Sequence, residues 1–285
     1  MIIYLAGVNS ENFAEVAYGA NILTTYWETK KWKDGVLGQF RRRFAFNRVF
    51  LDCGAYSAWT SGQEVDIDRY CSFLHRNMDG ATEYPQLDVK GDYQKTRDNL
   101  LYMERQGLTP MPVFHMRDTP IDYFKELVDK GHTRIALGAM AGEKGLDKDL
   151  VDSKLRTIFA YITDKETGVV KVKLHAFGQT GIDILLKYPF YSADSTSWLG
   201  GAKYGSVIVF DWKDGKLKDV SASSKLYKNA FLRIDPRYRS PRFTHSKGGK
   251  TYVRRLVLGR LAYEDAEKYI TAVWKQRGIS FIDET

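Results

Sequence analysis

Residues Met111–Ala139 read MPVFHMRDTPIDYFKELVDKGHTRIALGA. Met111–Met116 is a short apolar run and predicts a strand, and Ile121–Lys130 has the apolar spacing of an amphipathic helix that ends at Gly131. Arg134–Ala139 is a second apolar run. A strand, a helix and another strand in this order predict a parallel βαβ unit.

The same alternation runs along most of the chain. At 285 residues and 44% hydrophobic, the chain has the size of one (β/α)8 barrel and enough apolar residues for a large core. The sequence therefore predicts an α/β fold, a TIM-like (β/α)8 barrel. The further predicted strands are Ile2–Ala6, Val49–Cys53, Tyr84–Val89, Val172–Phe177 and Tyr191–Asp194, and the further predicted helices are Asn12–Tyr26, Ile67–Met78, Tyr93–Gln106, Leu150–Thr163 and Ile182–Lys187.

The alternation breaks after Asp194, where a basic C-terminal decoration begins. Val207–Trp212 and Lys216–Val220 flank a Lys-Asp-Gly turn and predict a hairpin. We expect one domain over 1–285, with a basic hairpin and loop insertion around 206–250 and a helical region over 252–278 that is interrupted near Gly259.

Positive charge is concentrated in this decoration. The chain has a net charge of +8 and a pI of about 9.2, and 14 Lys and Arg against three acids lie between Lys213 and Arg260. Clustered positive charge indicates a polyanionic partner, most simply nucleic acid, and the alternative is an ordinary solvated surface. The candidate nucleic-acid-binding residues are Arg233, Arg237, Arg239, Arg242, Lys247, Lys250, Arg254 and Arg255.

The cysteines and the apolar runs bear on location. Cys53 and Cys71 provide neither a disulfide framework nor a four-ligand zinc site, which fits a reducing cytoplasm. The N-terminal apolar run has no basic segment before it, and no run has membrane-spanning length. We expect a cytoplasmic protein with no membrane partner.

Polar or glycine-rich residues follow the predicted strands. Because barrel active sites lie at the carboxyl ends of the strands, these positions predict one site. Asp194 lies in YSADSTSWLGGAKYG (191–205) and is interpreted as a nucleophile or, alternatively, as a turn aspartate. The strand ends concerned are Asp52, Asp88, His115, Gly138, His175 and Asp194.

Five segments in order carry a resemblance to a known family. They are LDCGAYSAW (51–59), LDVKGDY (87–93), ALGAMAG (136–142), HAFGQTGIDILLKYP (175–189) and YSADSTSW (191–198). Together they resemble the tRNA-guanine transglycosylase superfamily, and most of all its branch of DpdA-type DNA 7-deazaguanine transglycosylases of phages and bacterial DNA-modification clusters. The resemblance implies exchange of guanine in DNA for a 7-deazaguanine base such as preQ0, through a covalent aspartyl intermediate.

The resemblance also implies roles for single residues. Asp194 matches the attacking aspartate, Asp52 the general acid/base, and Asp88 the aspartate that reads the guanine edge. Tyr56, Trp59 and Trp198 lie beside the catalytic aspartates in sequence, so they stack on a flipped base or are wall aromatics. The remaining implied base-pocket residues are His115, Gly138, Ala139, His175 and Phe177, and for His175 a structural role is the alternative.

Two departures from the family bear on the substrate. No cysteine follows Cys71, so the family's zinc site is absent, and His115 replaces a glutamine. We expect no metal and no cofactor, with DNA, guanine and the free 7-deazaguanine base as partners. The alternatives are the same exchange on tRNA, an inactive nucleic-acid-binding barrel, and a barrel enzyme that binds a phosphorylated substrate at Gly200-Gly201.

Overall fold

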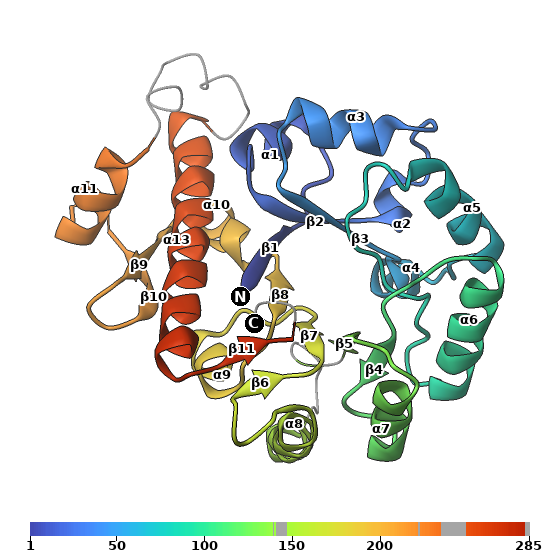
Figure 1. Cartoon of the computed structure of the whole chain (residues 1–285). Coiled ribbons are helices and arrows are strands. Elements are labelled where there is room, and N and C mark those ends of the chain that lie inside the picture. Colours follow the sequence, from blue (N-terminus) through green and yellow to red (C-terminus); the bar gives the residue numbers. More distant parts are fainter. Residues whose placement is uncertain (139, 141–146, 222, 235–248, 283–285) are drawn as a thin grey trace.

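A computed structural model describes residues 1–138, 140, 147–221, 223–234 and 249–282. Its centre is a curled sheet of seven strands in the order β3-β2-β1-β8-β7-β5-β4, all pairs of which are parallel (Figure 1). The strands are β1 (Ile2–Ala6), β2 (Asn21–Thr25), β3 (Arg48–Asp52), β4 (Val113–His115), β5 (Arg134–Gly138), β7 (Lys173–Ala176) and β8 (Ser192–Ser195).

The sheet has an apolar layer on each face. One layer is a small cluster built from Tyr4, Phe50, Val113 and Ala136, which belong to four different strands. The other layer is the main core between the sheet and the helices. The helices that lie between β1 and β8 along the chain are α1 (Glu11–Val16), α2 (Tyr26–Thr29), α3 (Val36–Arg43), α4 (Ala55–Thr60), α5 (Ile67–Asn77), α6 (Tyr93–Arg105), α7 (Ile121–Asp129), α8 (Lys148–Ile162) and α9 (Ile182–Lys187).

The predicted strand Tyr84–Val89 is not a regular strand, so the sheet is not a closed eight-stranded barrel. Two isolated parallel bridges, Phe50 with Glu83 and Pro85 with Met111, connect this segment to its neighbours on both sides. Pro85 has no N–H for a ladder. Gln86 donates its backbone N–H to the Met111 carbonyl at 2.9 Å, and its side-chain Oε1 accepts the backbone N–H of Val113 at 3.2 Å. Of the fold prediction, the parallel α/β sheet is confirmed, and the sheet is curled.

The predicted helix Asn12–Tyr26 is wrong over its second half. Helix α1 ends at Val16, and Gly19 takes a left-handed backbone at φ +74°. Strand β2 then runs over Asn21–Thr25 and pairs with both β1 and β3. Its Ile and Thr residues favour a strand, and the apolar spacing on either side of Gly19 concealed it.

The C-terminal decoration contains the predicted hairpin, β9 (Val207–Asp211) paired antiparallel with β10 (Lys216–Val220). The 3-10 helix η1 (Ser197–Leu199) and α10 (Gly200–Tyr204) precede it, and α11 (Lys225–Leu232) follows it. The long helix α13 (Gly249–Gln276) packs along the hairpin, α10 and β1 (Figure 1). After α13, the short strand β11 (Ser280–Phe281) pairs in parallel with β6 (Val169–Val170).

The predicted interruption near Gly259 is absent, because α13 runs through this residue. A Cβ on Gly259 would lie 2.3 Å from the Trp198 carbonyl oxygen. The glycine therefore lets α13 contact the segment directly after β8. No helix among the described residues is both long and apolar enough to span a membrane.

Candidate active site

The carboxyl edge of the sheet collects the predicted site residues. Asp52 ends β3, His115 ends β4, Gly138 ends β5, and Asp194 lies near the end of β8. The register places His115 directly beside Gly138. Phe177 follows β7 and donates its N–H to a carbonyl of β5. Parallel pairing thus brings side chains from across the chain to one edge.

Asp194 is held by two donors that both contact Oδ1. The backbone N–H of Gly178 donates at 3.0 Å, and Nε2 of His175 lies at 3.3 Å. On the other side of the imidazole, Nδ1 lies 2.9 Å from the Ser192 hydroxyl. Asp194 is buried, at 6% exposed, and these contacts fix its Oδ1.

His175 is fully buried, and its surroundings are those of a structural residue. Its ring stacks on Phe50 with centroids 4.6 Å apart and meets Phe177 edge-on at 4.7 Å. The prediction that His175 contacts a base directly does not fit this burial. The residue instead orients Asp194 through Nε2, in agreement with the alternative that His175 has a structural role.

Asp52 is a carboxyl group that keeps its proton to a higher pH than an ordinary aspartate. Burial, followed by the negative charges of Asp88 and Asp194, raises the pKa of Asp52 to about 7. The backbone N–H of Gly54, which donates to Oδ2 at 3.1 Å, opposes part of this rise. Gly54 has φ +77°, and a Cβ there would lie 2.5 Å from Cβ of Trp27. Only glycine permits this turn after β3.

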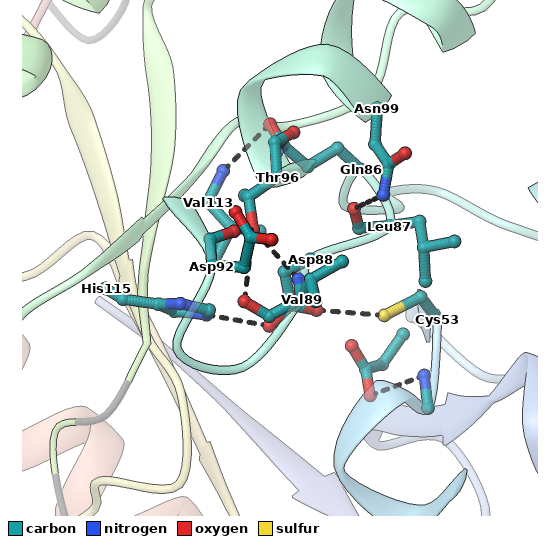
Figure 2. Close-up of polar contacts among 12 residues, drawn as sticks. Cys53, Gln86, Leu87, Asp88, Val89, Asp92, Thr96, Asn99, Val113 and His115 are labelled. Carbon is teal, nitrogen blue, oxygen red and sulfur yellow. Dashed lines mark hydrogen bonds and ion pairs between the residues drawn. The ribbon is translucent and has the colours of Figure 1, made fainter. Parts of the chain in front are cut away.

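Asp88 has the opposite environment (Figure 2). Burial raises its pKa, but the hydrogen bond and charge of His115 outweigh this, so the pKa of Asp88 lies below its ordinary value. Its Oδ2 lies 2.8 Å from Nε2 of His115, and its Oδ1 accepts the thiol of Cys53 at 3.1 Å. An ionised carboxylate only accepts hydrogen bonds, so Nε2 of His115 carries the proton.

Cys53 is a site residue that the sequence did not reveal. It is buried, and its thiol donates to Asp88. Burial raises the pKa of this thiol, which keeps it a donor. Strand alternation after Asp52 concealed the role, because the chain turns at Gly54 and the strand pattern ends there. Gly178 and Ser192 were missed for a similar reason, since backbone donors and hydroxyls carry no motif of their own.

The three aromatic candidates divide into two groups. Tyr56 and Trp59 on α4 are 64% and 55% exposed, and their ring centroids lie 6.2 Å apart. Trp198 is fully buried and donates its indole N–H to the carbonyl of Ala6 at 2.9 Å. The prediction of Trp198 as a base-stacking residue is therefore wrong, because no face of its ring is accessible.

The basic candidates also differ from one another. Arg233 forms a bidentate ion pair with the buried carboxylate of Asp265, in which Nη2 lies 2.8 Å from Oδ1, so its charge is already compensated. Arg254 and Arg255 are half-buried on α13, and the Arg254 guanidinium lies 5.7 Å from the ring centroid of Phe231. The other candidates lie outside the described residues: Arg237, Arg239, Arg242 and Lys247, the side chain of Lys250, and, among the base-pocket residues, Ala139.

Among the described residues, no group of three or more His, Cys, Asp or Glu side chains is arranged to hold a metal ion. A comparison with protein-family models and with curated proteins finds no match for this chain.

Proposed function

We propose that the chain is a DNA guanine transglycosylase that replaces guanine with a 7-deazaguanine base through a covalent aspartyl-deoxyribose intermediate. The observation that carries this proposal is the contrast between two carboxyl groups at one edge of the sheet. Asp194 is fixed by two donors on Oδ1, whereas Asp52 is an acid whose pKa is raised to about 7. A carboxylate that is held in place by hydrogen bonds and a second carboxyl group with a raised pKa suit a nucleophile and a general acid.

In the first step, Oδ2 of Asp194 attacks C1′ of the deoxyribose. Among the described residues both donors to Asp194 contact Oδ1, so Oδ2 is the oxygen that reacts. The C1′–O bond forms as the C1′–N9 bond breaks, and the electron pair of that bond leaves on guanine. Protonated Asp52 donates its proton to the departing base, which would otherwise carry negative charge.

In the second step, Asp52 is a carboxylate and takes the N9 proton of the incoming 7-deazaguanine. The N9 lone pair attacks C1′ and displaces Asp194, which returns as a carboxylate. Two displacements restore the original configuration at C1′, as base exchange within an intact strand requires. A pKa of about 7 lets one group act as acid and then as base near neutral pH.

Asp88 is suited to select the base. Its pKa lies below the ordinary value, and the thiol of Cys53 and the imidazole of His115 fix its two oxygens. An ionised carboxylate accepts from the N1–H and the 2-amino group of guanine, whereas adenine has no donor at these positions. The same edge is present in 7-deazaguanines, so one pocket can take both bases.

The proposal includes three finer points. The fold is a variant of the TIM-like barrel in which two isolated bridges, at Glu83 and Pro85, stand between β3 and β4 in place of an eighth strand. DNA is the macromolecular partner, supported by the net charge of +8 and its concentration after Lys213. The protein acts in the cytoplasm without a bound cofactor, consistent with two free buried cysteines.

The decisive experiment follows release of labelled guanine. DNA and, separately, tRNA that carry labelled guanine are incubated with the protein and 7-cyano-7-deazaguanine. We expect release from DNA and incorporation of the new base. Release from tRNA alone would move the substrate to RNA, and release from neither with several 7-deazaguanines would refute the exchange reaction.

Variants of Asp194 test the assigned nucleophile. Asp194→Asn and Asp194→Ala should lower the exchange rate by at least about 1,000-fold while DNA affinity stays within about twofold. Asp122→Asn is the matched control, because this carboxylate on α7 is 86% exposed in its side chain. Exchange at the normal rate in Asp194→Ala would remove this residue from the mechanism.

A further inference from the structure

Next to the candidate active site, α4 presents an exposed aromatic pair that the proposed chemistry does not use. Tyr56 is 64% and Trp59 55% exposed, although Trp and Tyr side chains are usually largely buried. Helix α4 begins three residues after Asp52, and Lys90 lies two residues after Asp88. The pair therefore belongs to the same edge of the sheet as the two aspartates.

A lysine covers these rings. The ammonium of Lys90 lies 3.9 Å from the ring centroid of Trp59 and 5.9 Å from that of Tyr56. The contact links α4 to the loop after Asp88. An ammonium above an exposed ring is held by cation–π attraction and remains at the protein surface.

A second aromatic–lysine contact, between two half-buried residues, lies beside the first. On α2, the ammonium of Lys30 lies 3.0 Å from the ring centroid of Trp27. The turn at Gly54 packs on Cβ of Trp27, and α2 contacts α4 (Figure 1). Two aromatic–lysine units thus adjoin the carboxyl ends of β2 and β3. We name the surface formed by Trp27, Lys30, Tyr56, Trp59 and Lys90 the aromatic rim.

We infer that the aromatic rim binds single-stranded DNA next to the target nucleotide, with bases stacked on Trp59 and Trp27 and phosphates paired with Lys90 and Lys30. Alternating aromatic rings and cations suit a strand that offers bases and phosphates alternately. This inference rests on the proposed function, since it places the strand beside the guanine to be exchanged.

The chemistry at the rim favours this occupant over others. Stacking of a base on an exposed tryptophan is stronger than an exposed cation–π contact, so a base displaces the ammonium from the ring face. The freed ammonium then pairs with a neighbouring phosphate.

The inference is tested by binding, without turnover. An end-labelled, guanine-containing single strand of about 15 nucleotides is titrated with the protein, and fluorescence anisotropy gives Kd. Trp59→Ala should raise Kd by about tenfold and Trp59→Phe by no more than about threefold, because a phenyl ring still stacks. Tyr161→Ala is the control, since Tyr161 is 42% exposed on α8, away from the rim, and its Kd should be unchanged.

Each outcome decides the inference separately from the exchange reaction. Unchanged Kd in Trp59→Ala, or an equal rise in Tyr161→Ala, overturns the aromatic rim even if guanine exchange is observed. A selective rise in Trp59→Ala supports the rim even if no exchange occurs. An RNA strand of the same sequence with the same selective loss also supports it, and tighter RNA binding would redirect the proposed substrate.

Discussion

Gly138 lies against His115 so closely that a Cβ at Gly138 would sit 2.5 Å from Cδ2 and 3.1 Å from Nε2 of the imidazole. The two residues are partners in the register of β4 and β5. The same Nε2 contacts Asp88 at 2.8 Å. The glycine therefore provides the space in which His115 can reach Asp88.

Gly138→Ala should push the imidazole away from Asp88. We expect about a tenfold higher KM for the incoming base with a smaller change in kcat, because base recognition is weakened more than nucleophilic attack. Gly200→Ala is the control, since the nearest atom to its Cβ is Cδ1 of Ile208 at 3.8 Å. Steady-state exchange kinetics give both constants, and an unchanged KM in Gly138→Ala would contradict this role.

Cys53 should act as a donor to Asp88 as well as a packing residue. Cys53→Ala removes the thiol that lies 3.1 Å from Oδ1, and Cys53→Ser retains a donor there. We expect KM for the base to rise about fivefold in the alanine variant and to recover in the serine variant, since one hydrogen bond is worth about 1 kcal/mol. Cys71→Ala, at the other buried cysteine, measures the cost of a cavity alone. Equal KM values in Cys53→Ala and Cys71→Ala would leave Cys53 as a packing residue.

Periodic segments were predictable from the sequence, and bonds between segments were not. Helices α5 and α6 begin at the predicted residues because Asp66 and Asp92 cap them, and both caps can be read from the sequence. Strand β2 was missed because five residues after a glycine give little periodic signal. The segment at Pro85 was predicted as a regular strand because its apolar pattern does not reveal that its pairing is limited to two isolated bridges, at Glu83 and at Pro85.

The candidate site shows the same division. The positions of Asp52, His115 and Asp194 follow from the rule that polar residues end parallel strands. The burial of Trp198 does not follow from sequence, because it depends on α13 passing close to η1 at Gly259. Sequence proximity to Asp194 could not distinguish a wall aromatic from an accessible one.

Arg233 should contribute to stability and leave DNA binding unaffected. Arg233→Gln leaves the buried carboxylate of Asp265 without its bidentate partner, which should lower the free energy of unfolding by about 3 kcal/mol. The slope of log Kd against log salt for DNA should not change, because the charge is already paired. Arg254→Gln is the comparison, and it should reduce that slope by about 1 if Arg254 contacts a phosphate. A reduced slope in Arg233→Gln would restore this residue to the DNA interface.

The pKa of Asp52 makes a prediction about stability that does not depend on the identity of the substrate. In the unfolded chain the carboxyl group titrates near its ordinary value of 3.8, and in the folded chain near 7. Between these values the folded protein binds more protons than the unfolded chain. The contribution of Asp52 to the free energy of unfolding therefore falls as pH rises from about 4 to about 7.

Asp52→Asn should remove this pH dependence. The amide keeps an oxygen that can accept from Gly54 but carries no charge beside Asp88 and Asp194. Near pH 4 the free energy of unfolding of the variant should equal that of the wild type. Between pH 4 and pH 7 the variant should become more stable than the wild type, and at pH 8 the difference should be on the order of 3 kcal/mol. Urea unfolding at pH 4, 5.5, 7 and 8 measures the difference, and Asp122→Asn should follow the wild-type curve at every pH because its carboxylate is exposed. A constant difference between Asp52→Asn and wild type across this range would show that Asp52 is ionised throughout, and the assignment of Asp52 as the general acid would fall with it.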